Sequence, residues 1–230
     1  VDGTLDTAFT PGTGADDIIY AVAIQADGKI LIGGDFLNYN GTGINRIARL
    51  DDDGTIDAGF TPGSAANNTV RAIVQQADLK IVIGGDFTSY NGTGINRIAR
   101  LVVAGTLDGT FTPGTGANGT VYAVKEQADF KILIGGNFTD YDGTAVNRIA
   151  RISSAGAIDL TFAIGDGADK NVFALAIQAD DKVVIGGEFD NFNLVHRKFL
   201  NRVSALGVSD ITFNFSLSIE RLLVPRERRS

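Results

Sequence analysis

The sequence predicts an all-β protein made of repeated four-stranded units, and three observations carry this prediction. First, one eight-residue phrase occurs four times, as KILIGGDF, KIVIGGDF, KILIGGNF and KVVIGGEF, at a constant interval of 51 residues. A fixed period of this length is typical of repeat architectures. Second, short apolar segments rich in β-branched residues alternate with turn sequences, as strands do. Third, the segments between turns are too short and too rich in Gly for helices.

The first complete repeat contains four predicted strands, at residues 18–25, 29–34, 45–50 and 56–60. Asp27-Gly28 between the first two is a tight hairpin signal. The later repeats have a different residue in place of Gly28, so this hairpin is not of the Asp-Gly type throughout; the residues are Leu79, Phe130 and Asp181. Further turn clusters at residues 39–43 and 51–55 separate the remaining strands.

The second strand indicates how the repeats pack. Neighbouring residues in a strand point to opposite faces of the sheet, yet Ile30, Leu31 and Ile32 are all apolar. Both faces must therefore be covered. Without helices, a small sheet can achieve this only by stacking between copies of itself, which predicts a β-propeller of four complete four-stranded blades. Each buried Ile or Leu contributes about 1.5–3 kcal/mol, so repetition is the source of stability.

Three motifs resemble the delta-60 repeat family. They are G-T-L-D-x-x-F, then V-x-A-x-x-Q-A-D-x-K-I-x-I-G-G-x-F, then N-R-I-A-R-L, and three of the repeats match them closely over nearly the whole chain. The resemblance implies a propeller-like repeat found in bacterial, often large and surface-associated proteins whose biochemical role is largely undefined. It implies no catalytic residues.

We expect one repeat domain over residues 1–230, with repeats at 10–60, 61–111, 112–162 and 163–213. Residues 1–9 then form an orphan strand, and residues 214–230 form a tail or a partial blade. Joining the two ends would give a ring of five blades, one of them incomplete. The alternatives are four closed blades with loose ends, or a part of a longer array; the absence of Met suggests a removed leader or a piece of a longer chain.

The fourth repeat departs from the others. The Asn201-Arg202 pair lies 54 residues after Asn147-Arg148, rather than 51. This spacing predicts a loop over residues 193–200 that is about three residues longer, and the loss of the second Arg of the motif. Such a departure suits a terminal capping unit.

Composition excludes several kinds of function. The net charge of −7 disfavours nucleic acid and acidic membrane surfaces as partners, because both require a positive footprint. No apolar run is long enough to insert in a membrane. The absence of Cys excludes disulfides, and the single His, His196, excludes a multi-His zinc site. His196 has no obvious nucleophile beside it in the sequence, so we expect no enzyme and no cofactor.

Recurring charged residues predict structural ion pairs, one in each blade. An Arg inside an apolar strand needs a carboxylate partner, because an unpaired buried charge is costly. The residues are Arg49, Arg100 and Arg151, with Asp57, Asp108 and Asp159. A calcium loop is a further possibility at Asp51, Asp53 and Asp57, where acidic residues alternate. Because the equivalent turns of the next repeats lack acids, a plain hairpin turn is the alternative.

The loops after each Gly pair predict a candidate ligand face, since four copies would form a ring on one side of a propeller. Aromatic rings beside amide and carboxylate groups could bind a sugar there; the alternative is that the rings belong to the core. The residues are Tyr39, Asn40, Tyr90, Asn91, Tyr141, Asp142, Phe192 and Asn193.

Together these features predict a non-enzymatic recognition or scaffold module, extracellular or at the cell surface, that presents a propeller face to a protein or glycan partner, other copies of itself included. Two alternatives stay open. The protein could be a structural component of a fibre or array in which incomplete end blades pair between chains. It could also be a carbohydrate-active hydrolase, which would require a cluster of acids with perturbed pKa values.

Overall fold

The computed structural model describes residues 3–213, and this part of the chain contains strands and turns but no helix. Consequently, none of the described residues belongs to a helix that could cross a membrane. The predicted tail or partial blade at 214–230 lies outside the described residues.

Each repeat forms one antiparallel three-stranded sheet in which the second strand is central. In the first repeat the strands are β1 (Ile19–Ile24), β2 (Ile30–Gly34) and β5 (Ile47–Leu50). The later sheets comprise β6 (Val70–Gln75), β7 (Ile81–Gly85) and β10 (Ile98–Leu101); β11 (Val121–Glu126), β12 (Ile132–Gly136) and β15 (Ile149–Ile152); and β16 (Val172–Ile177), β17 (Val183–Gly187) and β20 (Leu200–Val203). We call each sheet with its loops a blade.

The predicted fourth strand is reduced to one bridged residue. Leu50 pairs with Ile56, and the same bridge recurs in the other three repeats. Just after it, the chain bends: the Phe60 N–H donates to the carbonyl of Asp57, whose side chain accepts from the Gly59 N–H. This turn draws the segment away from the sheet, so the expectation of four-stranded sheets is wrong for the described residues.

The predicted turn at residues 39–43 is instead a small hairpin. Its tip, Asn40-Gly41, has φ values of 47° and 75°, the left-handed pair that Asn-Gly favours. The hairpin strands are β3 (Asn38–Tyr39) and β4 (Thr42–Gly43), then β8 (Ser89–Tyr90) and β9 (Thr93–Gly94), β13 (Asp140–Tyr141) and β14 (Thr144–Ala145), and β18 (Asn191–Phe192) and β19 (Val195–His196).

The turn at Gly28 keeps one conformation in all four repeats despite its changing residue. Gly28 has a φ of 87°, and Leu79, Phe130 and Asp181 have φ values of 68°, 63° and 60°. In each case the N–H at this position donates to the carbonyl of the Gln three residues earlier. The repeat therefore imposes the left-handed turn even on side chains that disfavour it.

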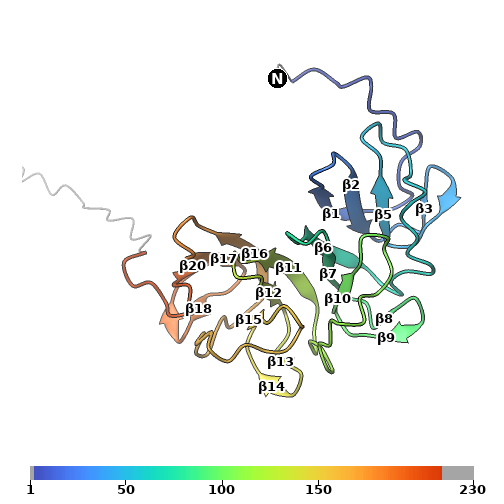
Figure 1. The fold of residues 1–230 in the computed structure, drawn as a ribbon. Helices are drawn as coiled ribbons and strands as arrows, with labels where there is room; N and C mark the ends of the chain where they lie inside the picture. Colours follow the sequence, from blue (N-terminus) through green and yellow to red (C-terminus); the bar gives the residue numbers. More distant parts are fainter. Residues whose placement is uncertain (1–2, 214–230) are drawn as a thin grey trace, which may run out of the picture.

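The four blades follow one another along an arc, with β1, β6, β11 and β16 on its concave side (Figure 1). These inner strands contact those of the neighbouring blades. Side chains from two consecutive blades combine in one hydrophobic cluster; for example, Leu31 and Ile47 of the first pack with Val70, Ile81 and Ile83 of the second. The prediction that each sheet is covered by its own copies is therefore confirmed for the inner junctions.

The first Gly of each pair makes this stacking possible. A Cβ at Gly33 would lie only 2.7 Å from Val70 Cγ1 and 2.8 Å from Ile73 Cδ1 of the next blade. Gly84 faces Val121 in the same way, and Gly135 faces Val172. Glycine is thus required because another sheet approaches closely, not because the backbone bends.

The arc of described residues is open. The first and fourth blades lie at its two ends (Figure 1). Val22 on the free side of the first blade is 63 % exposed, whereas its equivalent Leu175, covered by the third blade, is 5 % exposed. Residues 3–213 therefore do not form the closed ring of four blades that was one of the alternatives.

Residues 3–9, the predicted orphan strand, contain no strand. Phe9 nevertheless lies beside Gly54, as Phe60 lies beside Gly105 one repeat later. The Thr10 N–H also donates to the carbonyl of Asp53, at 2.7 Å. This segment therefore repeats the contact by which the end of one blade joins the next.

The fourth repeat keeps the 51-residue register, so the predicted longer loop at 193–200 is wrong. Arg202 pairs opposite Val184, as Arg151 pairs opposite Leu133. Phe199 occupies the place of Arg148, and both have a positive φ. The Arg that this repeat lacks is therefore the first of the motif, not the second. Asn201 replaces the Ala of the motif and happens to precede Arg202, so the Asn-Arg pair reflects a substitution and not an insertion.

The predicted ion pairs are confirmed. Nε of the Arg lies 2.6 Å from the carboxylate of the Asp in the pair Arg49–Asp57, and 2.8 Å in both Arg100–Asp108 and Arg151–Asp159. A fourth pair, Arg202–Asp210, lies at 2.8 Å.

Each of the first three guanidinium groups also donates to a carbonyl of the following blade. The acceptors of Arg49, Arg100 and Arg151 are the carbonyls of Val103, Ser154 and Ala205. The guanidinium of Arg49 also stacks over the Phe60 ring, with 5.1 Å from Cζ to the ring centroid. One residue thus joins its own strand, the bridged segment and the next blade.

Replacing Arg100 tests this role. Arg100→Leu should lower the free energy of unfolding by about 3 kcal/mol, because Lys80, at 3.1 Å, would be the one ion-pair partner left to Asp108 among the described residues, and the contact with the next blade would be lost. Urea denaturation followed by circular dichroism measures the change.

Arg202→Leu is the matched control. Arg202 is partly exposed and has no following blade within the described residues, so its loss should cost about 1 kcal/mol. An equal loss of unfolding free energy in the two variants would contradict the role of Arg100 in joining consecutive blades.

Acid should destabilise the protein through the same pairs. Burial raises the pKa of Asp159, but the Thr161 hydroxyl and N–H and the Arg151 guanidinium outweigh it and lower this pKa to about 2. Because an unfolded Asp titrates near about 3.9, the unfolded chain binds more protons in this window. Stability should therefore fall as pH drops from about 4 through 2. Asp159→Asn should flatten this dependence in denaturation series across pH 2–6; an unchanged slope would contradict the assignment.

Candidate functional site

The aromatic rings of the predicted ligand face are buried. Tyr39 is 3 % exposed, and the rings at the equivalent positions are at least as buried: Tyr90, Tyr141 and Phe192. The Tyr90 hydroxyl donates to the carbonyl of Gly105 at 2.7 Å, and Tyr39 and Tyr141 make the same bond to Gly54 and Gly156. Burial raises the pKa of both Tyr90 and Tyr141. An exposed sugar platform on these rings is therefore ruled out.

The polar residues next to these rings hold the loops. The side-chain oxygen of Asn40 accepts from the Thr13 N–H at 3.1 Å, and the equivalent residue of each later repeat accepts from a backbone N–H in the same way; these are Asn91, Asp142 and Asn193. Their role in the structure is to fix the hairpin against the preceding loop.

The acids of the possible calcium loop do not gather around one point. Lys29 Nζ lies 2.5 Å from Asp51 and 3.0 Å from Asp57, so a cation of the protein already neutralises both. Asp53 instead accepts from the Thr55 hydroxyl and N–H. Within residues 3–213 no three potential ligand side chains are grouped to hold a metal ion.

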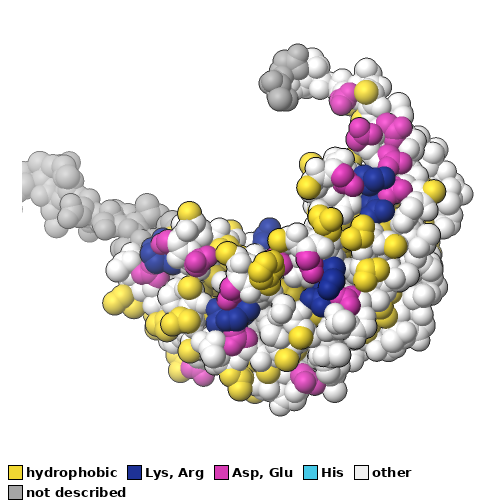
Figure 2. All heavy atoms as spheres, viewed as in Figure 1, with side chains coloured by type: hydrophobic (Ala, Val, Ile, Leu, Met, Phe, Trp, Pro, Cys, Tyr) yellow, Lys and Arg dark blue, Asp and Glu magenta, His cyan; other side chains and the backbone are white. Residues whose placement is uncertain are grey.

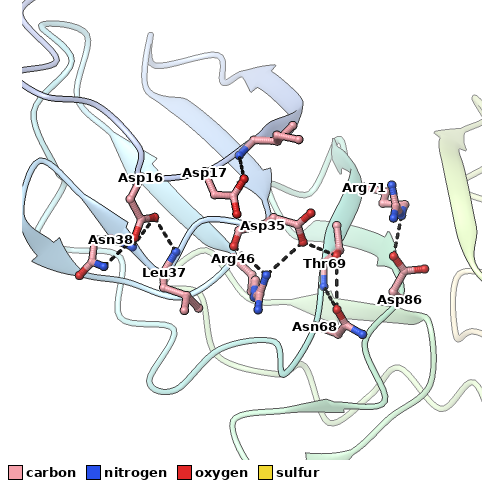
Figure 3. A network of polar contacts seen from close by, with 11 residues as sticks. Asp16, Asp17, Asp35, Leu37, Asn38, Arg46, Asn68, Thr69, Arg71 and Asp86 are labelled. Carbon is pink, nitrogen blue, oxygen red and sulfur yellow. Dashed lines mark hydrogen bonds and ion pairs between the residues drawn. The ribbon is translucent and has the colours of Figure 1, made fainter.

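A polar network lies where the inner strands begin and the Gly pairs end (Figure 3). Asp35 pairs with Arg46 at 3.0 Å and accepts from the hydroxyl of Thr69 in the next blade. Asp86 likewise accepts from the hydroxyl of Thr120 in the third blade, but its carboxylate pairs at 2.6 Å with Arg71 of the inner strand rather than with Arg97, the equivalent of Arg46. We call this edge of the arc the rim.

The rim Arg residues have an unusual backbone. Arg46, Arg97 and Arg148 have φ values of 62°, 65° and 68°, which non-glycine residues seldom adopt. Arg46 and Arg97 each donate through Nη1 to the backbone carbonyl of the Asp in their own blade, Asp35 and Asp86. These two bonds hold the guanidinium groups in place.

The third blade breaks the pattern. Asn137 stands where the first two blades have Asp, so Arg148 has no carboxylate beside it at this position. Arg148 Nε and Asn137 Oδ1 are both buried, and neither has a hydrogen-bond partner among the described residues. A buried donor without a partner is uncommon in a folded protein, so Arg148 is the rim residue that most needs an explanation.

Arg148 also lines a groove of about 640 Å³ between the third and fourth blades. The other lining residues include Asn147, Asp166, Asp169, Asn191 and Leu194. Burial raises the pKa of Asp169, but hydrogen bonds from the Asn191 and Asp190 N–H groups and the Asn191 side chain outweigh it, so the pKa is lowered and Asp169 stays ionised. The groove therefore carries both signs of charge.

A smaller groove, of about 300 Å³, lies at the equivalent junction of the second and third blades. It is lined by the equivalent residues Asn96 and Arg97, but there the guanidinium is already held by Asp86. The third junction thus differs from its repeat by one free guanidinium edge rather than by a new loop.

The concave side carries a row of stacked side chains that sequence reasoning missed. The guanidinium of Arg71 lies over the rings of Tyr20 and Tyr122, at 4.7 and 5.5 Å, and Tyr122 meets Phe173 edge to face at 5.2 Å. These four residues occupy the same position of the repeat, the variable position of V-x-A. Three aromatic residues and one Arg at that position are the sequence pattern that could have predicted the row. On the face drawn in Figure 2, hydrophobic side chains lie beside basic and acidic ones along this edge.

Removing one hydroxyl distinguishes a core ring from a ligand platform. Tyr90→Phe should lower the free energy of unfolding by about 1 kcal/mol, because the Gly105 carbonyl loses a buried donor. Thermal denaturation measures the change. Tyr20→Phe is the control, because it removes the same hydroxyl from a partly exposed ring. It should leave the free energy of unfolding within about 0.5 kcal/mol of that of the starting protein. An unaffected Tyr90→Phe protein would contradict the structural role.

Two distant likenesses are among the solved structures that the chain resembles. A protein of unknown function from Bacteroides caccae shares 13 % identity at a TM-score of 0.44, over 84 % of this chain and 67 % of that one. YCF48 bound to a D1 peptide shares 12 % identity at a TM-score of 0.47, over 91 % of this chain and 56 % of that one, so this chain spans little more than half of its length. Comparison with curated proteins gives no match.

Family profiles are more informative. The profile described as "Domain of unknown function (DUF5122) beta-propeller" matches residues 25–60, 76–111 and 127–162, one segment in each of the first three repeats and at the same 51-residue spacing. This agrees with the resemblance to the delta-60 repeats. These three segments match that β-propeller repeat family of unknown function.

Proposed function

We propose that the protein is a non-enzymatic recognition module, extracellular or at the cell surface, and that it binds a protein partner at the groove between its third and fourth blades. The observation that carries the proposal is the guanidinium of Arg148: its buried Nε has no partner among the described residues, and the residue lines the groove of about 640 Å³ between the third and fourth blades. In the other two repeats with this Arg, the guanidinium donates to the protein itself.

A carboxylate of the partner is the group that best satisfies Arg148. An unmade buried hydrogen bond costs about 1–3 kcal/mol, and a ligand that makes the bond recovers this. Hydrogen bonds between guanidinium and carboxylate are also stronger than neutral ones.

A polypeptide fits the groove better than a glycan. Asp166 and Asp169 place negative charge near Arg148, so a purely anionic polymer would be repelled, whereas a peptide presents donors and acceptors of both signs. Stacking surfaces for sugar rings are scarce as well. The four rings of the predicted ligand face are buried, and Arg71 covers the rings of Tyr20 and Tyr122.

The non-enzymatic character and the location are part of the proposal. The strongly shifted carboxyl groups are Asp57, Asp108, Asp159 and Asp210, each of which lies in an ion pair that recurs from blade to blade, as structural pairs do. The extracellular or cell-surface location is proposed from the resemblance to the delta-60 repeats. The competing functions are a fibre component and a hydrolase.

Selection from a random peptide display library tests the proposal. Peptides that bind the protein should be enriched in Asp or Glu, and Arg148→Gln should weaken their binding at least about tenfold, the loss of one charge-assisted hydrogen bond. Because Arg148 Nε has no hydrogen bond to lose among the described residues, this variant should keep its melting temperature.

Lys182→Gln is the matched control, since it removes one positive charge at the other end of the fourth blade, next to Asp180. It should bind the selected peptides as the starting protein does. Selection that yields no binders, or binders equally weakened by both substitutions, would refute the groove as the recognition site. A glycan array read in parallel would show whether the partner is instead a carbohydrate.

A further inference from the structure

The two ends of the arc present the two halves of a contact that the chain makes three times inside itself. At each inner junction, apolar side chains of an inner strand fit against the first Gly and the neighbouring residues of the preceding blade. At the third junction, Val172 and Leu175 fit against Gly135, and Ile177 packs in the same cluster. We call the projecting residues knobs and the receiving surface the socket.

The first blade has knobs without a socket. Ile19, Val22 and Ile24 correspond to Val172, Leu175 and Ile177, and they are equally apolar. Ile24 is 76 % exposed and Val22 63 %. Adjacent exposed aliphatic residues on one strand form the kind of patch that monomeric proteins seldom leave uncovered.

The fourth blade has a socket without knobs. In the third blade the socket consists of Ala123, Leu133, Gly135 and Ile149, all buried under the fourth blade. The equivalent residues of the fourth blade are just as apolar but partly or fully exposed; they are Ala174, Val184, Gly186 and Leu200. A Cβ at Gly186 would meet nothing closer than Ala174 Cβ at 3.6 Å, whereas a Cβ at Gly135 would collide with Val172.

The polar part of the contact is divided in the same way. Arg151 Nη1 donates to the Ala205 carbonyl of the next blade at 2.6 Å, and Arg202 is its equivalent in the fourth blade. The carbonyl that corresponds to Ala205 in the first blade is that of Asp52, an exposed residue. One end therefore holds the donor and the other the acceptor.

We infer that a second copy of this chain docks head to tail, with the knobs of its first blade in the socket of the fourth blade of its neighbour. The contact would continue an interface that already occurs three times, with side chains of the same kind and size. It would also place Tyr20 of one copy after Phe173 of the other, which extends the stacked row of the concave side across the junction.

At the outer edge of the docked copies, two Phe rings would compete for the same place beside one glycine. Phe9 lies beside Gly54 within its own chain, and Phe213 of the neighbouring copy, the equivalent of Phe60, would approach the same glycine. One of the two must move aside. Residues 3–8 are exposed, so docking displaces this segment rather than the blade.

Sedimentation velocity over about 1–100 μM tests the inference with two blocked ends. Val22→Asp places a charge on the knobs, and Gly186→Val fills the socket. The unsubstituted protein should exceed the 24.2 kDa monomer, and each variant alone should stay monomeric. An equimolar mixture should form a two-chain complex, because each variant keeps one intact end.

Two controls keep the test interpretable. Leu160→Asp alters an exposed Leu away from both ends and should leave assembly unchanged. Gly186→Val should keep the melting temperature, whereas Gly84→Val, the same change inside the arc, should lower it, because its Cβ alone would lie 2.6 Å from Val121 Cγ1. A monomeric starting protein at 100 μM, or a mixture of variants that stays monomeric, would overturn head-to-tail docking.

Discussion

The structure depends on one constraint: a small sheet that is apolar on both faces can be stable only between two neighbours. Each blade has three strands, too few to bury its own surface, so hydrophobic clusters form between blades rather than inside them. Close approach is what makes this burial effective, because dispersion contacts are lost when a gap opens. The Gly at the end of each second strand provides that approach, and this explains why the phrase around it is the most regular part of the repeat.

The recurrent Arg–Asp pair meets a second requirement of stacking. The third strand and the bridged segment of a blade must keep their positions while the blade packs against its neighbour. An Arg that pairs with Asp in its own blade, covers a Phe ring and donates to a carbonyl of the next blade does all three. Because the guanidinium is planar and has several donors, Lys could not replace it in this position. Burial of the pair is tolerated since each charge keeps its partner and further hydrogen bonds.

Function in such a protein is more readily sought in departures from the repeat than in the repeat itself. Positions that recur from blade to blade, such as the buried Tyr of the first three blades and its carbonyl acceptor, serve packing. The rim is different, because Asn137 stands where the first blade has Asp35, and Arg148 lacks the carboxylate with which Arg46 pairs. The ends are different as well, because the same knobs and sockets that are covered inside the arc are uncovered there. Both features arise from a regular framework that is locally interrupted.

The sequence alone determined the period, the three main strands of each repeat, the stacking of two-faced sheets and the Arg–Asp pairs. These follow from spacing and from the cost of leaving apolar or charged groups uncovered, which are properties of the chain itself. Tertiary structure decided the rest. Whether Tyr90 lies inside or outside depends on the Gly105 carbonyl, which is 15 residues away in sequence. Whether Arg202 is the second Arg of the repeat depends on its pairing opposite Val184. The spacing of Asn-Arg pairs along the chain does not show this pairing, because Asn201 precedes Arg202 by coincidence. Whether the arc closes depends on how each blade is turned against the next, and that angle is set by side-chain packing that no spacing along the chain records.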